Sequence, residues 1–199
     1  MTLRRLIGIL GIILPIMLLF YSLAIKQGEI ESSISLYYFT PARNEFIIIL
    51  SLLSLFLLCY EGYDNDRFFS RAAGFCGMVV ALVHTNYKNS DTPCADHGLN
   101  LREYIHLGGA VIFFLLLAYM SFFLFTKTSE ENASRGELPP LKARRNFIYR
   151  LCAIIIVISL LTIAVFFFVK GVHNALCEYK PIFWLESIAL WAFGFAWLV

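Results

Sequence analysis

The chain has 199 residues, of which 59% are hydrophobic and only 15% are charged, and its formal net charge is +2. In soluble domains about a quarter of all residues are charged, so this composition excludes an ordinary soluble protein. The high hydrophobicity of the chain excludes a disordered protein. The small net charge is unlike the clustered basic surface of a nucleic-acid-binding protein, so we expect no nucleic-acid partner. The class that remains is a polytopic membrane protein.

Six continuously apolar segments approach the roughly 20 residues that a helix needs to cross a bilayer. They are expected at 6–25, 45–62, 69–87, 104–126, 148–170 and 181–199. Continuous apolar runs favour helices over the alternating pattern of barrel strands. The first run is longer than the apolar core of a signal peptide, which favours a retained span. The predicted fold is therefore a single all-α domain, a bundle of six transmembrane helices.

The distribution of Lys and Arg predicts that both termini are cytoplasmic, because cytoplasmic loops carry an excess of these residues. In this orientation the inside holds ten of the 16 basic residues: Arg4, Arg5, Arg67, Arg71, Lys127, Arg135, Lys142, Arg144, Arg145 and Arg150. The segment 127–145 is the longest polar stretch and is expected to be an irregular cytoplasmic linker, since it contains Gly136, Pro139 and Pro140.

The five cysteines fall into two groups. Cys59, Cys76 and Cys152 lie inside predicted spans, where we expect them to be small buried apolar groups. Cys94 and Cys177 lie in the two predicted outer loops, 88–103 and 171–180. Because these loops would face an oxidising compartment, we predict a disulfide between Cys94 and Cys177; in the reverse orientation the reducing cytoplasm would oppose it.

Three ionisable side chains lie near the outer ends of predicted spans: His84, His106 and Glu186. Polar groups in a bilayer are costly and therefore mark candidate functional sites. Small residues recur at helical spacing beside each of them, on faces that allow close helix packing. For His84 this face is formed by Ala73, Gly77 and Ala81. The three side chains are therefore expected to line one outward-opening pocket.

Two imidazoles and a carboxylate admit more than one chemistry. His84, His106 and Glu186 could hold zinc or iron with open positions, and a metal-bound water could hydrolyse a lipid ester or amide. Alternatively, His106 and Glu186 could act as a catalytic proton-accepting pair or bind a ligand without metal. The third interpretation is structural: each group bonds a neighbouring helix and fixes the packing.

The first outer loop contains several serines, three consecutive aromatic residues (Tyr37, Tyr38 and Phe39) and Arg43. Consecutive aromatic residues are typical of a belt at the membrane interface. Alternatively, the hydroxyl groups and Arg43 cap the pocket or bind a lipid phosphate, which a guanidinium fits well. Tyr37, Arg43 and His84 are therefore the candidate ligand-binding residues.

Several motifs are spread over nearly the whole chain: Ser33-Ile34-Ser35-x-Tyr37-Tyr38-x-Thr40-x-x-Arg43-x-x-Phe46, Gly62-Tyr63-Asp64, His106, Pro181-x-Phe183-Trp184-x-Glu186 and Phe193-Gly194-x-x-Trp197. Together they resemble a family of small bacterial membrane proteins with six spans, classed as a domain of unknown function. The resemblance implies an integral membrane protein of a bacterial envelope but no established reaction. The family has Phe-Pro-Thr where this chain has Val83-His84-Thr85, so the resemblance favours Tyr37, Arg43, His106 and Glu186 over His84.

A looser similarity of architecture connects the chain with intramembrane hydrolases of the alkaline ceramidase type. Those enzymes use a serine and three histidines around zinc, two of them in a His-x-x-x-His motif. This chain lacks that motif and has one predicted span fewer, so the comparison is one of architecture alone.

The leading hypothesis is a multi-pass inner-membrane protein whose outward-facing pocket binds a lipid or another amphiphile. Tyr37 and Arg43 would engage the head group, and His106 and Glu186 would form the floor of the pocket. The alternatives are a lipid hydrolase that uses a metal or a His/Glu pair, a proton-coupled transporter, and a structural subunit of a membrane complex. Membrane lipids are the expected partners, and the sequence leaves open enzymatic activity, bound metal and homo-oligomerisation.

Overall fold

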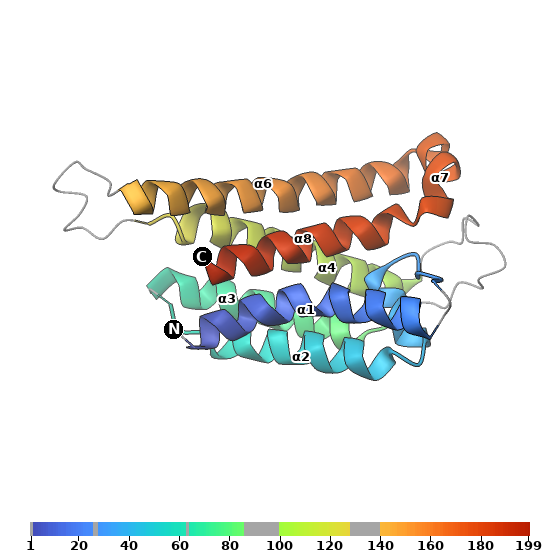
Figure 1. Ribbon diagram of the computed structural model, residues 1–199, viewed down its shortest axis with the longest axis horizontal. Helices are drawn as coiled ribbons and strands as arrows, with labels where there is room; N and C mark the ends of the chain where they lie inside the picture. The colour runs from blue at the N-terminus through green and yellow to red at the C-terminus, as the bar shows by residue number, and fades with distance from the viewer. Residues whose placement is uncertain (1, 26–27, 63, 86–99, 128–139) are drawn as a thin grey trace.

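The computed structural model describes residues 2–25, 28–62, 64–85, 100–127 and 140–199, and within this part of the chain all regular secondary structure is helical. The long helices lie along the longest axis of the molecule (Figure 1). They are α1 (Thr2–Ala24), α2 (Arg43–Cys59), α3 (Asp64–Leu82), α4 (Leu101–Tyr119), α6 (Pro140–Phe168) and α8 (Pro181–Leu198). The π-helix η2 (Met120–Leu124) continues α4, and the shorter elements are η1 (Ile34–Phe39), α7 (Lys170–Leu176) and η3 (Cys177–Tyr179). The predicted all-α fold is confirmed.

The six long helices form a closed ring in sequence order. Each helix packs against the next one along the chain, and α8 packs against α1 to complete the ring. Successive helices run in opposite directions, so α1 begins and α8 ends at the same end of the molecule, marked N and C in Figure 1. We call this the terminal end; the opposite, distal end holds η1, α7 and the start of α4.

Four helical segments are long and apolar enough to cross a membrane: Leu3–Ala24, Leu101–Leu124, Leu141–Phe168 and Pro181–Leu198. Only 28% of the most apolar window of the third segment is buried inside the molecule, as expected of a helix that faces lipid. With 17 residues, α2 is about 26 Å long, slightly less than the hydrocarbon thickness. The first two turns of α3 are charged. Six spans and cytoplasmic termini therefore stay predictions.

A close contact between helices joins α1 and α8, the first and last members of the ring. A Cβ atom built on Gly194 would lie 2.6 Å from the carbonyl oxygen of Gly8, and one built on Gly8 would lie 2.8 Å from that of Gly194. Only glycine permits this separation, which is how small residues drive helix packing in membranes. The contact packs the last turns of α8 against the first turns of α1 and so closes the ring.

Arg4 joins several helices at the terminal end of the ring. Its guanidinium donates to the carbonyl oxygen of Trp197 at 3.2 Å and to the Tyr149 hydroxyl at 2.9 Å. It also lies 4.6 Å from the centre of the Phe125 ring. The carbonyl groups at the end of a helix have no partner within the helix, so a cation there is favourable. Arg4 thus connects α1 with α6 and α8.

The structure corrects three predicted boundaries. The third helix covers Asp64–Leu82 instead of 69–87, because Asp64, Asp66 and Arg67 already belong to it. The fifth begins at Pro140, so the end of the predicted linker 127–145 is helical, as proline in a first turn allows. The predicted outer loop 171–180 contains most of α7 and all of η3.

Candidate functional site

The first predicted outer loop folds inward and closes the distal end of the ring. Its centre is η1, in which Ile34 is 5% exposed and Tyr37 is fully buried. The Thr40 hydroxyl ends η1 by donating to the carbonyl oxygen of Tyr37 at 2.8 Å, and it accepts the Ala42 N–H at 3.2 Å. This serves as a local turn, because threonine side chains often replace backbone partners where a helix ends. The chain then enters α2 directly.

Side chains from three helices hold η1 in place. The Ile34 N–H donates to Glu186 Oε2 of α8 at 2.7 Å, and the Ser35 hydroxyl lies 2.8 Å from His106 Nε2 of α4. The Tyr37 hydroxyl is hydrogen-bonded to Ser22 of α1. Glu186 and His106 therefore bind consecutive residues of η1, Ile34 and Ser35, so η1 connects α8 with α4.

The imidazole of His106 has a defined arrangement of hydrogen bonds. Its Nδ1 lies 2.6 Å from the carbonyl oxygen of Val83, which can only accept, so Nδ1 carries the hydrogen. In a neutral ring Nε2 then has a free electron pair, and the Ser35 hydroxyl donates to it. His106 is only 4% exposed. The arrangement of hydroxyl, imidazole and orienting acceptor is the one that activates serine nucleophiles.

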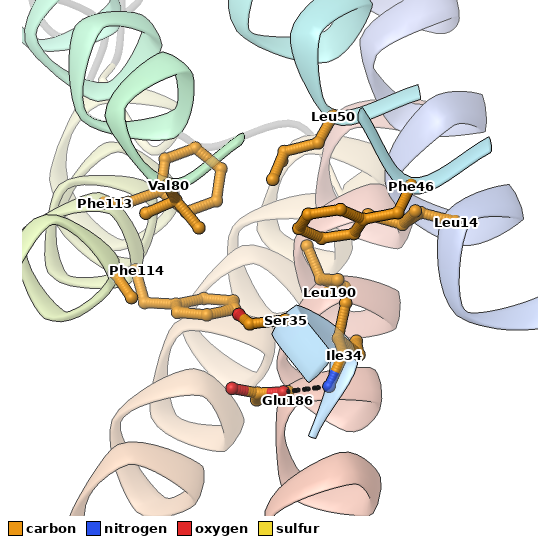
Figure 2. Close-up of a pocket in the computed structure, with 11 residues that line it drawn as sticks. Leu14, Ile34, Ser35, Phe46, Leu50, Val80, Phe113, Phe114, Glu186 and Leu190 are labelled. Atoms are coloured by element: carbon orange, nitrogen blue, oxygen red, sulfur yellow. Dashed lines mark hydrogen bonds between the residues drawn. The ribbon is translucent and has the colours of Figure 1, made fainter. Parts of the chain in front are cut away.

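A cavity lies inside the ring next to η1 (Figure 2). About 30 Å³ of it is open to the centre of a water-sized sphere, and the empty volume of about 370 Å³ around this includes open solvent, so the enclosed space is narrow. Ser35 and Glu186 lie together toward one end in Figure 2, and Leu50, Val80 and Phe113 lie toward the other. The lining comes from α1, η1, α2, α3, α4 and α8: Leu14, Ile34, Ser35, Phe46, Leu50, Val80, Ala110, Phe113, Phe114, Glu186 and Leu190.

A cationic and aromatic group, which we call the rim cluster, lies beside η1 at the distal end. It consists of Tyr38, Arg43, His84 and Arg102. The Arg43 guanidinium is hydrogen-bonded to the Tyr38 hydroxyl and lies 4.1 Å from the centre of the Tyr38 ring. The Tyr38 ring stacks on His84 at 4.7 Å, and Arg102 Nη1 lies 3.0 Å from His84 Nε2. Two exposed guanidinium groups thus share one small surface.

Two sequence-predicted ligand residues lie elsewhere than expected. His84 does not continue the face of Ala73, Gly77 and Ala81, because α3 ends at Leu82; it belongs to the rim cluster. Tyr37 is fully buried, so it does not belong to an interfacial belt or reach a head group at the surface. Tyr38 is the aromatic residue beside Arg43.

The structure does not assemble the predicted metal ligands His84, His106 and Glu186. The ring nitrogens of His84 meet the Thr85 carbonyl and Arg102, those of His106 meet Val83 and Ser35, and Glu186 accepts from Ile34. Within the described residues, no group of three or more His, Cys, Asp or Glu side chains could hold a metal ion. The metal-free versions of the hypothesis are the ones that this geometry supports.

The cysteine predictions have different outcomes. Cys59, Cys76 and Cys152 are free thiols, but only Cys152 is buried; Cys59 is exposed and Cys76 is intermediate. Cys177 is 5% exposed in η3. Cys94 lies outside the described residues, so its predicted pairing with Cys177 stays a prediction.

Sequence reasoning missed the specific partner of His106. The first outer loop contains several serines, and the sequence offers no reason to prefer Ser35 over Ser32 or Ser33. Arg102 was likewise not among the candidate residues selected from the sequence. The relevant signal was the combination of a serine-rich outer loop with a histidine near the outer end of a span, but tertiary contacts were needed to select the pair.

Comparisons with protein-family models, curated proteins and solved structures found no match.

Proposed function

We propose that this chain is a multi-pass protein of the bacterial inner membrane that binds one amphiphile at the distal end of its helix ring. The apolar chain of the ligand occupies the cavity, and its anionic head group binds the rim cluster. The observation that carries the proposal is the placement of a narrow apolar cavity within about one helical turn of Arg43, whose rim cluster also contains Arg102. The resemblance of the sequence motifs to a family of small bacterial membrane proteins supports the same proposal.

Two elements connect the cavity with the rim cluster. In η1, Ser35 lines the cavity and Tyr38 follows three residues later, which is one turn of a 3₁₀-helix, or about 6 Å. In α2, Phe46 lines the cavity and Arg43 precedes it by three residues, or about 4.5 Å along the helix. A ligand that touches both regions therefore spans only the distance between a head group and the first carbons of its chain.

The shape of the cavity favours an unbranched chain over a ring system. The empty volume of about 370 Å³ includes space that is open to solvent, so the enclosed part is much smaller than an ordinary ligand pocket of about 300–1,000 Å³. The part open to the centre of a water-sized sphere is only about 30 Å³, enough for about two waters. A narrow space with leucine and phenylalanine walls suits the first carbons of one unbranched chain and is too small for a ring system.

The rim cluster favours an anionic head group. Arg43 and Arg102 supply planar guanidinium groups, which bind phosphate oxygens by pairs of parallel hydrogen bonds. The two cations meet aromatic and imidazole rings in this cluster, which orient the guanidinium groups without neutralising them. A phosphate ester at the membrane surface fits this chemistry.

The test is to fill the cavity and count bound lipid. Ala110 lines the cavity, so Ala110→Phe would place a ring in it, whereas its neighbour Val111 is 42% exposed and serves as the control position. The protein is loaded from vesicles of phosphatidylethanolamine and phosphatidylglycerol, transferred to detergent and weighed by native mass spectrometry. We expect one retained phospholipid for the wild type and Val111→Phe, and at least a tenfold smaller adduct for Ala110→Phe. Equal adducts in all three proteins, at equal melting temperatures, would refute the proposal.

A second experiment tests the head group. Arg43→Gln removes one guanidinium from the rim cluster, whereas Arg144→Gln removes an exposed arginine at the opposite end of the molecule. Hydrogen bonds to charged groups contribute about 1.5–3 kcal/mol, so Arg43→Gln should weaken retention of phosphatidic acid about 10- to 150-fold. Retention of diacylglycerol, which lacks the phosphate, should not change. A loss that is equal for both lipids, or no loss for either, would contradict an anion site at Arg43.

A further inference from the structure

We infer that Ser35 is a nucleophile activated by His106 and that it transfers the acyl group of an ester-linked amphiphile to water. This inference rests on the proposed function, because it needs the amphiphile in the cavity. It adds a reaction, a substrate bond and two catalytic residues to that function. The supporting observations are the partner of the Ser35 hydroxyl, the fixed orientation of His106, and the position of Ser35 on the cavity wall.

Ser35 differs from other buried serines of the bundle in what its hydroxyl meets. Ser54, Ser70 and Ser187 donate to main-chain carbonyl oxygens at 2.6–2.7 Å, which is the usual way to satisfy a serine in an apolar helix. Ser35 instead meets an imidazole nitrogen at 2.8 Å. A carbonyl cannot remove a hydroxyl proton, whereas an imidazole can, so only this contact is suited to general-base catalysis.

The main chain holds His106 in the orientation that this role needs. Val83 lies directly after α3, and its N–H is bonded to the Val79 carbonyl at 2.8 Å, so the last turn of the helix continues into it. The Val83 carbonyl oxygen accepts from Nδ1 at 2.6 Å and keeps the electron pair of Nε2 toward Ser35. Aspartate plays this part in the familiar serine triads; here a carbonyl oxygen takes it.

The cavity gives a bound chain access to the Ser35 hydroxyl. Ser35 and Glu186 are its polar wall residues, and Phe114 and Leu190 lie beside them in Figure 2. An acyl chain that lay along the apolar part of the cavity would present its carbonyl carbon at this polar end. With the phosphate at the rim cluster, the ester bond is the part of a phospholipid that lies between the two sites.

The reaction balances with water as the only co-reactant. Ser35 Oγ forms a bond to the carbonyl carbon of the ester, and its proton passes to His106 Nε2. The carbon–oxygen bond to the alcohol then breaks, and the same proton goes from Nε2 to the leaving oxygen. A water molecule next gives a proton to Nε2 and attacks the carbonyl carbon of the acyl-serine. The bond from this carbon to Oγ then breaks, and the proton on Nε2 passes to Oγ, which releases the fatty acid and restores both the Ser35 hydroxyl and the neutral imidazole.

The negative oxygen that forms during each attack needs hydrogen-bond donors. The N–H of Ile34, the residue directly before Ser35, donates in this structure to a carboxyl oxygen, Glu186 Oε2, at 2.7 Å. This donor therefore already points at an oxygen acceptor. A substrate carbonyl that displaced Glu186 would take over the same hydrogen bond.

The experiment is covalent labelling of the full-length protein in detergent with a long-chain alkyl phosphonofluoridate. Attack by Ser35 Oγ forms an oxygen–phosphorus bond and expels fluoride, so the adduct stays on the peptide and mass spectrometry locates it. We expect the wild type to be labelled at Ser35, and Ser35→Ala to be unlabelled. His106→Gln should be labelled at least 100-fold more slowly, since a general base contributes about 10²–10⁴-fold. Ser187→Ala and His173→Gln are matched controls, and both should be labelled like the wild type.

Each outcome decides the inference. A wild type that stays unlabelled at Ser35, although it retains phospholipid, would overturn the inference and leave the proposed binding function standing. Equal labelling of the wild type and His106→Gln, with equal melting temperatures, would also overturn it, because His106 would then not act as the base. Loss of both lipid retention and labelling in Ala110→Phe, with retained folding, would support it, since the apolar chain of the reagent needs the cavity.

Discussion

Removal of the His106 imidazole should destabilise the protein, because this side chain bonds two otherwise separate elements. His106→Ala leaves the Val83 carbonyl oxygen and the Ser35 hydroxyl without their partners at 2.6 and 2.8 Å. A buried polar group that loses its partner costs about 1–3 kcal/mol, so the two together cost about 3 kcal/mol by a moderate estimate. The space left by the ring adds to this cost, because His106 is 4% exposed.

The assay is thermal unfolding of purified protein in detergent, followed by the fluorescence of a thiol-reactive dye. For a chain of this size, about 1 kcal/mol corresponds to 2–4 °C, so His106→Ala should melt about 6–12 °C lower than the wild type. Ile105→Ala is the control on the same helix, since Ile105 is 47% exposed, and it should melt within about 2 °C of the wild type. If His106→Ala also melted within 2 °C, these hydrogen bonds would not hold η1 in place.

Three further predictions concern the frame around the site. Gly194→Ala should lower the melting temperature by several degrees, because the new Cβ atom would lie 2.6 Å from a main-chain oxygen of α1. Gly108→Ala is the control, since its Cβ atom would have no other atom within 4 Å. Equal melting temperatures of the two variants would show that α1 and α8 move apart without a cost in stability. Arg4→Met should destabilise by about 1.5–3 kcal/mol in chemical unfolding, since its charged hydrogen bonds join α1 with α6 and α8, and an unchanged midpoint would contradict this. Alkylation before and after reduction should reveal two additional reactive thiols, Cys94 and Cys177; no increase would refute their disulfide.

Composition and the apolar runs were sufficient to predict the bundle. Six transmembrane helices were expected; six long helices are present in the described residues, and four helical segments among them are long and apolar enough to cross a membrane. The boundaries were less accurate, as at α3, where the charged residues Asp64, Asp66 and Arg67 looked like a loop. Acidic residues are favourable in the first turn of a helix, and hydropathy alone does not register this effect.

Candidate residues could be selected from the sequence, but their contacts could not. His106 and Glu186 were selected because polar groups are rare in apolar spans, and both do point at the interior of the distal end. The hydropathy pattern gave no indication that a loop would fold between them. The aromatic residues of this loop suggested a belt at the membrane interface. Tyr37 is instead fully buried, and its hydroxyl is hydrogen-bonded to Ser22 inside the ring.

The sequence by itself determined the apolar composition that indicates a membrane protein, the helical architecture and a short list of polar residues at one end. These features depend on local composition and on spacing along one helix, which the order of residues records directly. Only the tertiary structure decided that α8 closes the ring against α1, that η1 enters it, and that Ser35, rather than Ser32 or Ser33, meets His106. The physical reason is that Ser35 and His106 are separated by 71 positions in the chain. Their 2.8 Å contact depends on how four helices and one short turn pack together.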